Sequence, residues 1–194
     1  LPHNPFKSLI VPRPIGWIST ISTDGIVNLA PYSFFNGASD SPPVLLFCAA
    51  HRPGNTMRKD SRTNAEETGE FVFNMASDAL RDQMSASAAS VPPEVDELAE
   101  AGLTPAPCRN VKPPRVGESP IAMECKYLQT VQLPSDDPEN ENVVVFGQVV
   151  GIHISDDIIG DDGLVDTLRF KPLARLGYWQ YTVIDNVFTM VPPD

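Results

Sequence analysis

The sequence lacks the features that mark membrane-spanning and secreted proteins. No apolar run approaches the ~20 residues that a helix needs to cross a bilayer. The opening stretch, LPHNPFKSLIVPRP, is broken by prolines and has no apolar core of the signal-peptide kind. Cysteine is scarce: three residues in 194, odd in number and widely spaced. We therefore expect reduced thiols and a cytoplasmic protein that does not insert into a membrane.

Basic residues are also few. Lys and Arg number 14 against 25 Asp and Glu, which gives a formal net charge of −11. A surface of this sign repels phosphate backbones and anionic lipid, so it argues against binding of nucleic acid and against docking on a membrane. A small anionic ligand is still allowed, because a local group of donors can oppose the overall charge.

Several catalytic and binding motifs are missing. There is no G-x-G-x-x-G after a strand and no G-x-x-x-x-G-K-[ST], so neither of these nucleotide-binding loops is expected. The chain also lacks H-E-x-x-H, G-x-S-x-G and any CxxC pair. Its histidines, His3, His51 and His153, are far apart in the sequence, and their spacing predicts no metal site.

What the chain does have is enough apolar sequence for one core. Hydrophobic residues make up 42% of it, and the length suits a single domain over residues 1–194. β-Branched and aromatic stretches at 15–21 and 26–32 predict a hairpin that turns at 23–25. The apolar run at 44–50 is typical of a strand covered on both faces. Further strands are predicted at 70–75, 121–133 and 143–154, and a closing hairpin at 180–184 and 187–191 turns at Asp185 and Asn186.

Helices are fewer. Residues 61–68 predict one, with Thr63 and Glu66 as a capping box and Gly69 as its end. Shorter helices are expected at 77–88 and 94–101, and the proline-rich stretch 102–120 is expected to be irregular. About seven strands with two or three helices favour an antiparallel barrel or sandwich, and the strands do not alternate with helices as in a doubly wound sheet.

Two segments near the N-terminus carry residue types suited to a flat ligand. In RPIGWIST at 13–20, a cation, an indole and two hydroxyls flank a strand start and can hold a planar anion. An ordinary strand entry with an aromatic core residue is the favoured interpretation of this segment alone. In NLAPYSFFN at 28–36, Pro31 removes a ladder donor and predicts an edge or bulge whose free backbone groups can meet a heterocycle. An edge strand with ordinary aromatic packing explains it equally well.

A third segment suits phosphate. His51 and Arg52 are followed by KDSRTN at 59–64, so three of the chain's 14 Lys and Arg residues, together with His51, lie near a predicted helix start. Free N–H groups at a helix N-terminus, together with hydroxyls and cations, form a natural phosphate site. A plain helix cap with solvated charges is the alternative, and it is slightly favoured for the segment in isolation.

In combination, RPIGWIST, NLAPYSFFN, SPPVLLFCAA and KDSRTN strongly resemble the flavin reductase-like family, the FMN-binding split-barrel proteins of the flavoprotein oxygenase type. SPIAMECK at 119–126 and LARLGYWQY at 173–181 resemble later blocks of the family, so the resemblance covers residues 8–184. It implies a mainly β fold, a six-stranded antiparallel split barrel of Greek-key type with flanking helices. It also implies a homodimer with FMN near the subunit interface.

The resemblance also implies a set of flavin-binding residues. The residues near the ring or ribityl chain would be Trp17, Ser19, Thr20, Asn28, Ala30, Tyr32 and Ser33. Those around the phosphate would be Arg52, Lys59, Ser61, Thr63 and Asn64. Gly177, Tyr178 and Trp179 depart from the Gly-Gly that family members often carry there, which bears on the outer face of the flavin and the second substrate.

The implied activity is that of an NAD(P)H-dependent flavin reductase. Hydride would pass from a transiently bound NADH or NADPH to the flavin N5, and electrons would go on to free flavin, oxygen, a ferric chelate or a partner monooxygenase. An FMN-binding electron-transfer protein without its own nicotinamide site is one alternative, and a split-barrel module that has lost flavin is another. His153 could face the cleft, although a structural role is favoured.

Overall fold

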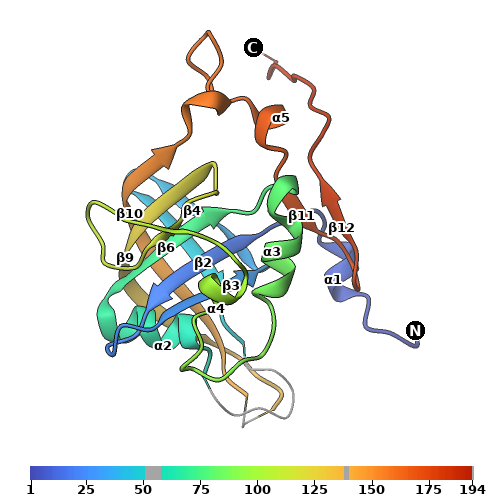
Figure 1. Ribbon diagram of the computed structural model, residues 1–194. Helices are drawn as coiled ribbons and strands as arrows, with labels where there is room; N and C mark the ends of the chain where they lie inside the picture. Colours follow the sequence, from blue (N-terminus) through green and yellow to red (C-terminus); the bar gives the residue numbers. More distant parts are fainter. Residues whose placement is uncertain (51–57, 138–139, 194) are drawn as a thin grey trace.

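The computed structural model describes residues 1–50, 58–137 and 140–193, and most of its strands form one antiparallel sheet (Figure 1). In the described residues this sheet has seven strands in the order β3-β2-β6-β9-β10-β5-β4. Their bounds are β2 (Gly16–Ile21), β3 (Val27–Tyr32), β4 (Phe35–Asp40), β5 (Pro43–Cys48), β6 (Glu70–Met75), β9 (Ile121–Leu133) and β10 (Asn142–Ile154). The mainly β antiparallel architecture is thus as predicted, with seven strands in this sheet rather than six.

The sheet curls into a barrel because its inward side chains share one core. Phe35 on β4 stacks on Phe73 on β6, with ring centroids 4.8 Å apart, although these strands are far apart in the strand order. Tyr32 on β3 likewise contacts Phe47 on β5, a strand far from it in the strand order, with ring centroids 5.0 Å apart. The same cluster takes in buried residues of β9 and β10, so both edges of the sheet pack against its middle.

The strand β5 is only partly as predicted. Leu45 and Phe47 are buried, whereas Val44, Leu46 and Cys48 are partly exposed. The expectation of two covered faces was therefore wrong, because β5 lies beside the exposed strand β4 and buries only its barrel side. The hairpin of β2 and β3 was predicted correctly, and its turn places Gly25 at a φ of 88°.

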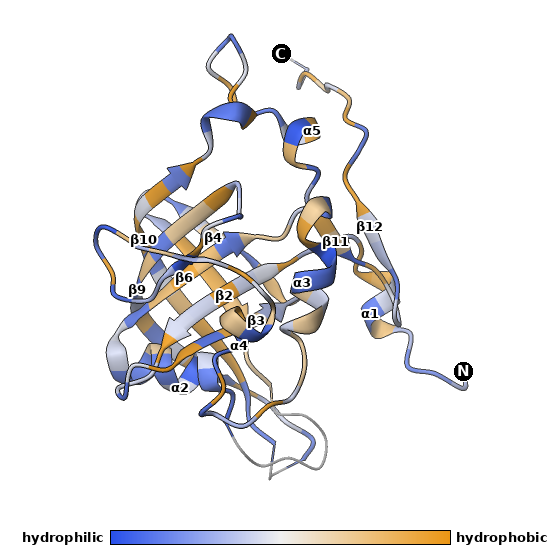
Figure 2. Ribbon diagram, in the orientation of Figure 1, coloured by the Kyte–Doolittle hydropathy of each residue, from blue (hydrophilic) through white to orange (hydrophobic). Residues whose placement is uncertain are grey.

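The helices lie around the barrel. They are α1 (Phe6–Leu9), α2 (Asp60–Thr68), α3 (Arg81–Ala86), α4 (Glu97–Glu100) and α5 (Thr167–Phe170), with 3-10 turns η1 (Asp78–Leu80) and η2 (Asp156–Ile158). None of the helices in the described part of the chain is long and apolar enough to span a membrane. α2 is hydrophilic along most of its length (Figure 2) and ends at Gly69, as predicted.

The predicted capping box of α2 is wrong. The residue that precedes the helix is Lys59, and no side chain caps its first turn. Thr63 lies within the helix rather than before it, because the helix begins three residues earlier, at Asp60. The carboxylate of Glu66 instead accepts hydrogen bonds from Arg62 Nε at 2.9 Å and from Thr130 Oγ1 at 2.7 Å.

The predicted C-terminal hairpin is also wrong. β12 (Tyr181–Val183) pairs with β11 (Leu173–Arg175), which in turn pairs with β1 (Arg13–Pro14) in a second, three-stranded sheet. The chain therefore turns between 176 and 180, where Leu176 N donates to Gln180 O, rather than at Asp185 and Asn186. Residues 187–191 form no strand, and Phe188, Met190 and Val191 on them are at least 80% exposed.

The proline-rich stretch 102–120 is irregular apart from two short strands, β7 (Pro105–Ala106) and β8 (Arg115–Val116). Its backbone is fastened to the sheet by buried side chains. Val116 N donates to Asn74 Oδ1 at 2.8 Å, and Lys112 N donates to Glu70 Oε2 at 2.7 Å. This stretch thereby lies against β6 and β9, on the side of the sheet away from the barrel core.

Candidate functional site

A cavity of about 630 Å³ opens where the end of β3 meets the beginning of α2. Its walls are completed by residues 87–93, which follow α3, and by Glu97 on α4. The volume falls in the range of about 300–1,000 Å³ that is usual for pockets that bind small molecules and cofactors. The cavity joins two segments that the sequence analysis singled out separately.

Six of the predicted ligand-binding residues line this cavity. They come from β3 and the residues just after it, and from the beginning of α2: Asn28, Ala30, Tyr32, Ser33, Lys59 and Ser61. Pro31 also lines it. It pairs with Trp17 of β2 on one side only, so β3 is an edge strand of the sheet, as a proline in this position predicts.

Two further predicted residues lie behind the cavity wall. Thr20 and Asn64 are buried, and Asn64 Nδ2 donates to Thr20 Oγ1 at 3.1 Å. Ser61 Oγ donates to Asn28 Oδ1 at 2.7 Å, and Thr20 Oγ1 donates to the same oxygen at 3.4 Å. The wall between β3 and α2 is thus one connected set of hydroxyl and amide groups.

The orientation of Asn28 depends on a residue that sequence reasoning missed. Asn28 Nδ2 lies 2.9 and 2.7 Å from the two carboxylate oxygens of Glu97, and Leu29 N donates to the same carboxylate at 3.1 Å. Glu97 therefore fixes which way the Asn28 amide faces. No local motif marks Glu97, because its role depends on α4 packing against β3. Burial raises its pKa, and the charge of Asp60 adds to this effect.

Three more predicted residues do not line the cavity, and a further one lies outside the described residues. Trp17 is fully buried and donates from Nε1 to Ser87 Oγ at 2.9 Å, so it supports the 87–93 wall from behind. Ser19 is also fully buried and donates to Pro114 O at 2.6 Å, which fastens the proline-rich stretch. Thr63 is not among the residues that line the cavity. Arg52 belongs to 51–57, outside the described part of the chain.

The cavity is electrostatically mixed. Lys7, Arg58 and Lys59 supply positive charge, and Asp60 and Glu97 supply carboxylates. Burial raises the pKa of Asp60, an effect that hydrogen bonding to its own backbone and the charge of Lys59 oppose. The lining therefore carries three basic and two acidic side chains, a balance less negative than that of the whole chain, whose net charge is −11.

His153 does not face this cavity. It lies on β10, where Nε2 is 2.6 Å from Glu124 Oε1, and neither residue is among those that line the cavity. The group that His153 forms with Glu124 is described further below.

Comparison with known proteins identifies the fold and the family. The family model described as "Flavin reductase like domain" matches residues 8–180. The chain belongs to the flavin reductase-like family. An uncharacterized protein of Aquifex aeolicus (strain VF5) is 43% identical over 169 residues, which is 87% of this chain and 83% of the relative.

Solved structures of this family's fold agree. Nitrilotriacetate monooxygenase component B from Bacillus cereus superposes with a TM-score of 0.88 at 29% identity, over 95% of this chain and 90% of the other. A protein with a split barrel domain from Shewanella frigidimarina NCIMB 400 superposes with a TM-score of 0.83 at 21% identity, over 97% and 90% of the two chains. The predicted family and its split-barrel fold are confirmed.

Proposed function

We propose that this flavin reductase-like protein is an FMN-dependent oxidoreductase that uses NADH or NADPH to reduce flavin. The observation that carries the proposal is the cavity between β3 and α2, whose lining includes six of the residues implied by the family resemblance. Membership of the family supports the use of flavin. The nicotinamide donor and the identity of the flavin as FMN are our inference.

The residues present suit a flat ring that carries a phosphate. At the α2 end, Lys59 and Ser61 would hold the phosphate, with Arg58 and Lys7 close enough to line the same cavity. Along β3, Ala30, Tyr32 and Ser33 would face the ring, next to apolar surface from Phe34. Charge-assisted hydrogen bonds and cations are what a phosphate dianion requires, and an apolar wall is what a fused ring requires.

When bound, FMN supplies the redox chemistry, because its ring can accept a hydride from a reduced nicotinamide. The protein's own residues then have three tasks. The cations offset the phosphate charge, the Asn28 amide is held in one orientation by Glu97, and the 87–93 segment closes one side of the cavity. None of these tasks needs a side-chain nucleophile, in keeping with the motifs that the sequence lacks.

An anaerobic absorption spectrum of the purified protein tests the proposal. We expect a yellow protein. Its visible flavin absorption band should disappear rapidly when one equivalent of NADH or NADPH is added. Bleaching by dithionite but by neither nicotinamide would instead identify an electron-transfer protein without a nicotinamide site. A colourless protein that takes up no added FMN would overturn the proposal and leave a structural module.

The partners belong to the same proposal. We infer a homodimer and, as one electron acceptor, a separate monooxygenase component. The similar structure from Bacillus cereus is named as component B of a monooxygenase, which supports the second inference. Free flavin, oxygen or a ferric chelate would accept the same electrons, so a screen of these acceptors with the reduced protein separates them.

A further inference from the structure

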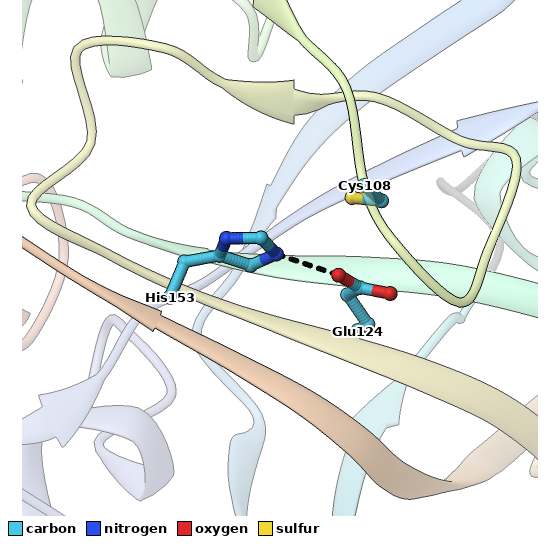
Figure 3. Close-up of side chains that lie close together, drawn as sticks. All are labelled: Cys108, Glu124 and His153. Carbon is cyan, nitrogen blue, oxygen red and sulfur yellow. Dashed lines mark hydrogen bonds and ion pairs between the residues drawn. The ribbon is translucent and has the colours of Figure 1, made fainter.

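A second group of reactive side chains lies on the side of the sheet away from the barrel core. Cys108 from the proline-rich stretch, Glu124 from β9 and His153 from β10 bring one ligand atom each within 4.8 Å of the others (Figure 3). None of the three lines the cavity described above. The group is independent of the flavin proposal.

Local sheet geometry explains how His153 and Glu124 meet. A bulge in β10 between Val149 and Gly151 shifts the register, so that Gly151 pairs with Glu124 and His153 pairs with Ala122. Residues two apart on a strand share a face, so His153 is the diagonal neighbour of Glu124. Gly151 leaves the space between them open, since a Cβ there would lie 3.1 Å from Glu124 Cδ and 2.7 Å from Asn110 Nδ2.

The Glu124 carboxylate is fully buried and firmly held. Oε1 accepts from Arg109 N at 2.9 Å, and Oε2 accepts from Asn110 N at 2.6 Å. These two backbone groups directly follow Cys108 in the chain, so the same turn that fixes the carboxylate also places the thiol. The His153 Nε2 atom lies 2.6 Å from Oε1 and is a further partner of this carboxylate.

The arrangement differs from that of a nucleophilic triad. In such a triad the thiol and the carboxylate contact opposite nitrogens of the imidazole, so that the ring can pass a proton from one side to the other. Here Glu124 contacts Nε2, and Figure 3 shows the Cys108 sulfur on the same side of the ring. The three donor atoms thus lie within 4.8 Å of one another without the order of a proton relay.

We propose that Cys108, Glu124 and His153 form a site for a divalent transition-metal ion, best suited to Zn²⁺. Thiolate, imidazole and carboxylate are the three side-chain ligands that zinc takes in proteins, and three of them leave a fourth tetrahedral position for water or a small anion. The His153 side chain is 21% exposed, so the site has a route to solvent. The metal would lie between His153 Nε2 and the Glu124 carboxylate, which now contact each other directly.

A divalent ion suits the charges that the three ligands would carry. An ion of charge +2 offsets both the buried carboxylate and the thiolate that forms on binding. Glu124 keeps its two backbone hydrogen bonds throughout, which act as the supporting contacts that orient a metal ligand.

Metal binding to the purified protein, stripped with a chelator and then titrated with Co²⁺ or Zn²⁺, tests the site. We expect one Zn²⁺ per chain, and a near-ultraviolet sulfur-to-cobalt charge-transfer band with Co²⁺. Cys108→Ser should abolish the band, and His153→Gln should weaken Zn²⁺ binding more than about tenfold. Cys48→Ser is the matched control, since Cys48 is also a half-buried free thiol, and it should keep the band and the affinity.

Two results would overturn the site. One is a wild-type protein that gives no cobalt–sulfur band at one equivalent of Co²⁺, and the other is a band that persists in Cys108→Ser. A melting temperature raised by Zn²⁺ in the wild type and in Cys48→Ser, but not in His153→Gln, supports it independently of the spectrum. If Cys108→Ser does not fold, the wild-type and His153→Gln measurements still decide. The flavin content of each sample is recorded separately, so the failure of one proposal leaves the other intact.

Discussion

At the scale of single residues, the proposed flavin site depends on hydroxyl and amide groups that already have partners. The Ser61 hydroxyl donates to Asn28 Oδ1, and Asn28 donates to Glu97. To donate to a phosphate, Ser61 would have to exchange one hydrogen bond for another. Its net contribution to FMN affinity is therefore expected at the lower end of the range of about 1.5–3 kcal/mol for hydrogen bonds to charged groups.

Ser61→Ala should weaken FMN binding about tenfold, because about 1.4 kcal/mol corresponds to a factor of ten in affinity. Thr63→Ala is the matched control: Thr63 lies on the same helix but does not line the cavity, and FMN affinity should stay within about twofold of the wild type. Quenching of flavin fluorescence on titration measures both. Equal losses in the two variants would show that the phosphate lies elsewhere on α2.

Glu66 gives the fold a pH dependence whose direction is fixed by its surroundings. Burial by itself would raise its pKa, but hydrogen bonds from Arg62 and Thr130 and the charges of Arg62 and Arg58 hold the pKa below its ordinary value. Because the folded pKa is the lower one, the ionised carboxylate stabilises the fold above the unfolded value of about 4.3. This contribution is lost as the pH falls through the folded pKa.

Glu66→Gln should accordingly lower the free energy of unfolding by about 1 kcal/mol at pH 7, with a difference that shrinks below about pH 4. Urea unfolding at pH 7, 5 and 3 measures this difference. The neighbouring exposed Glu67 provides the control, since Glu67→Gln should change stability by less than about 0.5 kcal/mol at each pH. A Glu66→Gln effect of constant size at all three values would argue against the assigned ion pair.

At the scale of elements, sequence patterns predicted what is local. The β2–β3 hairpin, α2 with its end at Gly69, and the long strands β9 and β10 follow from alternation, turn residues and helix stops. β4 was missed because FNGASD is polar and has no apolar period; it becomes a strand by pairing with β5. The C-terminal hairpin failed for the same kind of reason, since β12 finds its partner in β11.

The candidate site could likewise be predicted only where it depends on local residue types. The residues predicted on β3 and α2 were chosen because their types suit a ring and a phosphate, and six of them line one cavity because the fold brings those two elements together. Trp17 and Ser19 carry suitable groups, but their partners, Ser87 and the carbonyl of Pro114, lie far along the chain and lead them away from the cavity. Glu97 and the group around Glu124 were missed because such contacts have no signature in the local sequence.

Close approach of strands within the barrel yields a test of its packing. A Cβ on Gly147 of β10 would overlap the ring of Phe71 on β6 and lie 3.2 Å from Cys125 Cβ. Both neighbours are fully buried, so neither can move into solvent. We expect Gly147→Ala to lower the free energy of unfolding by about 1–3 kcal/mol, the usual cost of overpacking a core.

The control for this change is another strand glycine with open space. A Cβ on Gly37 of β4 would meet nothing within 4 Å, so Gly37→Ala should be neutral to about 0.5 kcal/mol. Denaturant unfolding followed by tryptophan fluorescence gives the free energy of unfolding of each variant. The two values are compared where the free energy depends equally steeply on denaturant concentration. Similar stabilities for Gly147→Ala and Gly37→Ala would mean that Phe71 and β10 are not in the close contact seen in the barrel.

At the scale of the whole molecule, a single chain leaves large apolar side chains in solvent. Trp179, in the turn that precedes β12, is 89% exposed, and Phe188, on the C-terminal segment that runs along the outside after β12 (Figure 1), is 81% exposed. Met190 and Val191 continue the same exposed stretch. Soluble monomers rarely expose contiguous apolar surface of this kind, and a second copy of the chain is the partner that the homodimer inference supplies.

Sedimentation velocity of the wild-type protein should therefore give a mass of twice the chain's 21.1 kDa at micromolar concentration. The double variant Trp179→Ser with Phe188→Ser replaces the two most exposed aromatic residues of this region, and it should shift the distribution toward the monomer. Nearly all of the area of these two apolar side chains is exposed in one chain, so their burial between two chains would stabilise the dimer. The thermal stability of the monomer itself should change little, since both side chains are more than 80% exposed. A wild-type protein that sediments as a monomer across the whole concentration range would contradict the homodimer, and the exposed segment would then need a different partner.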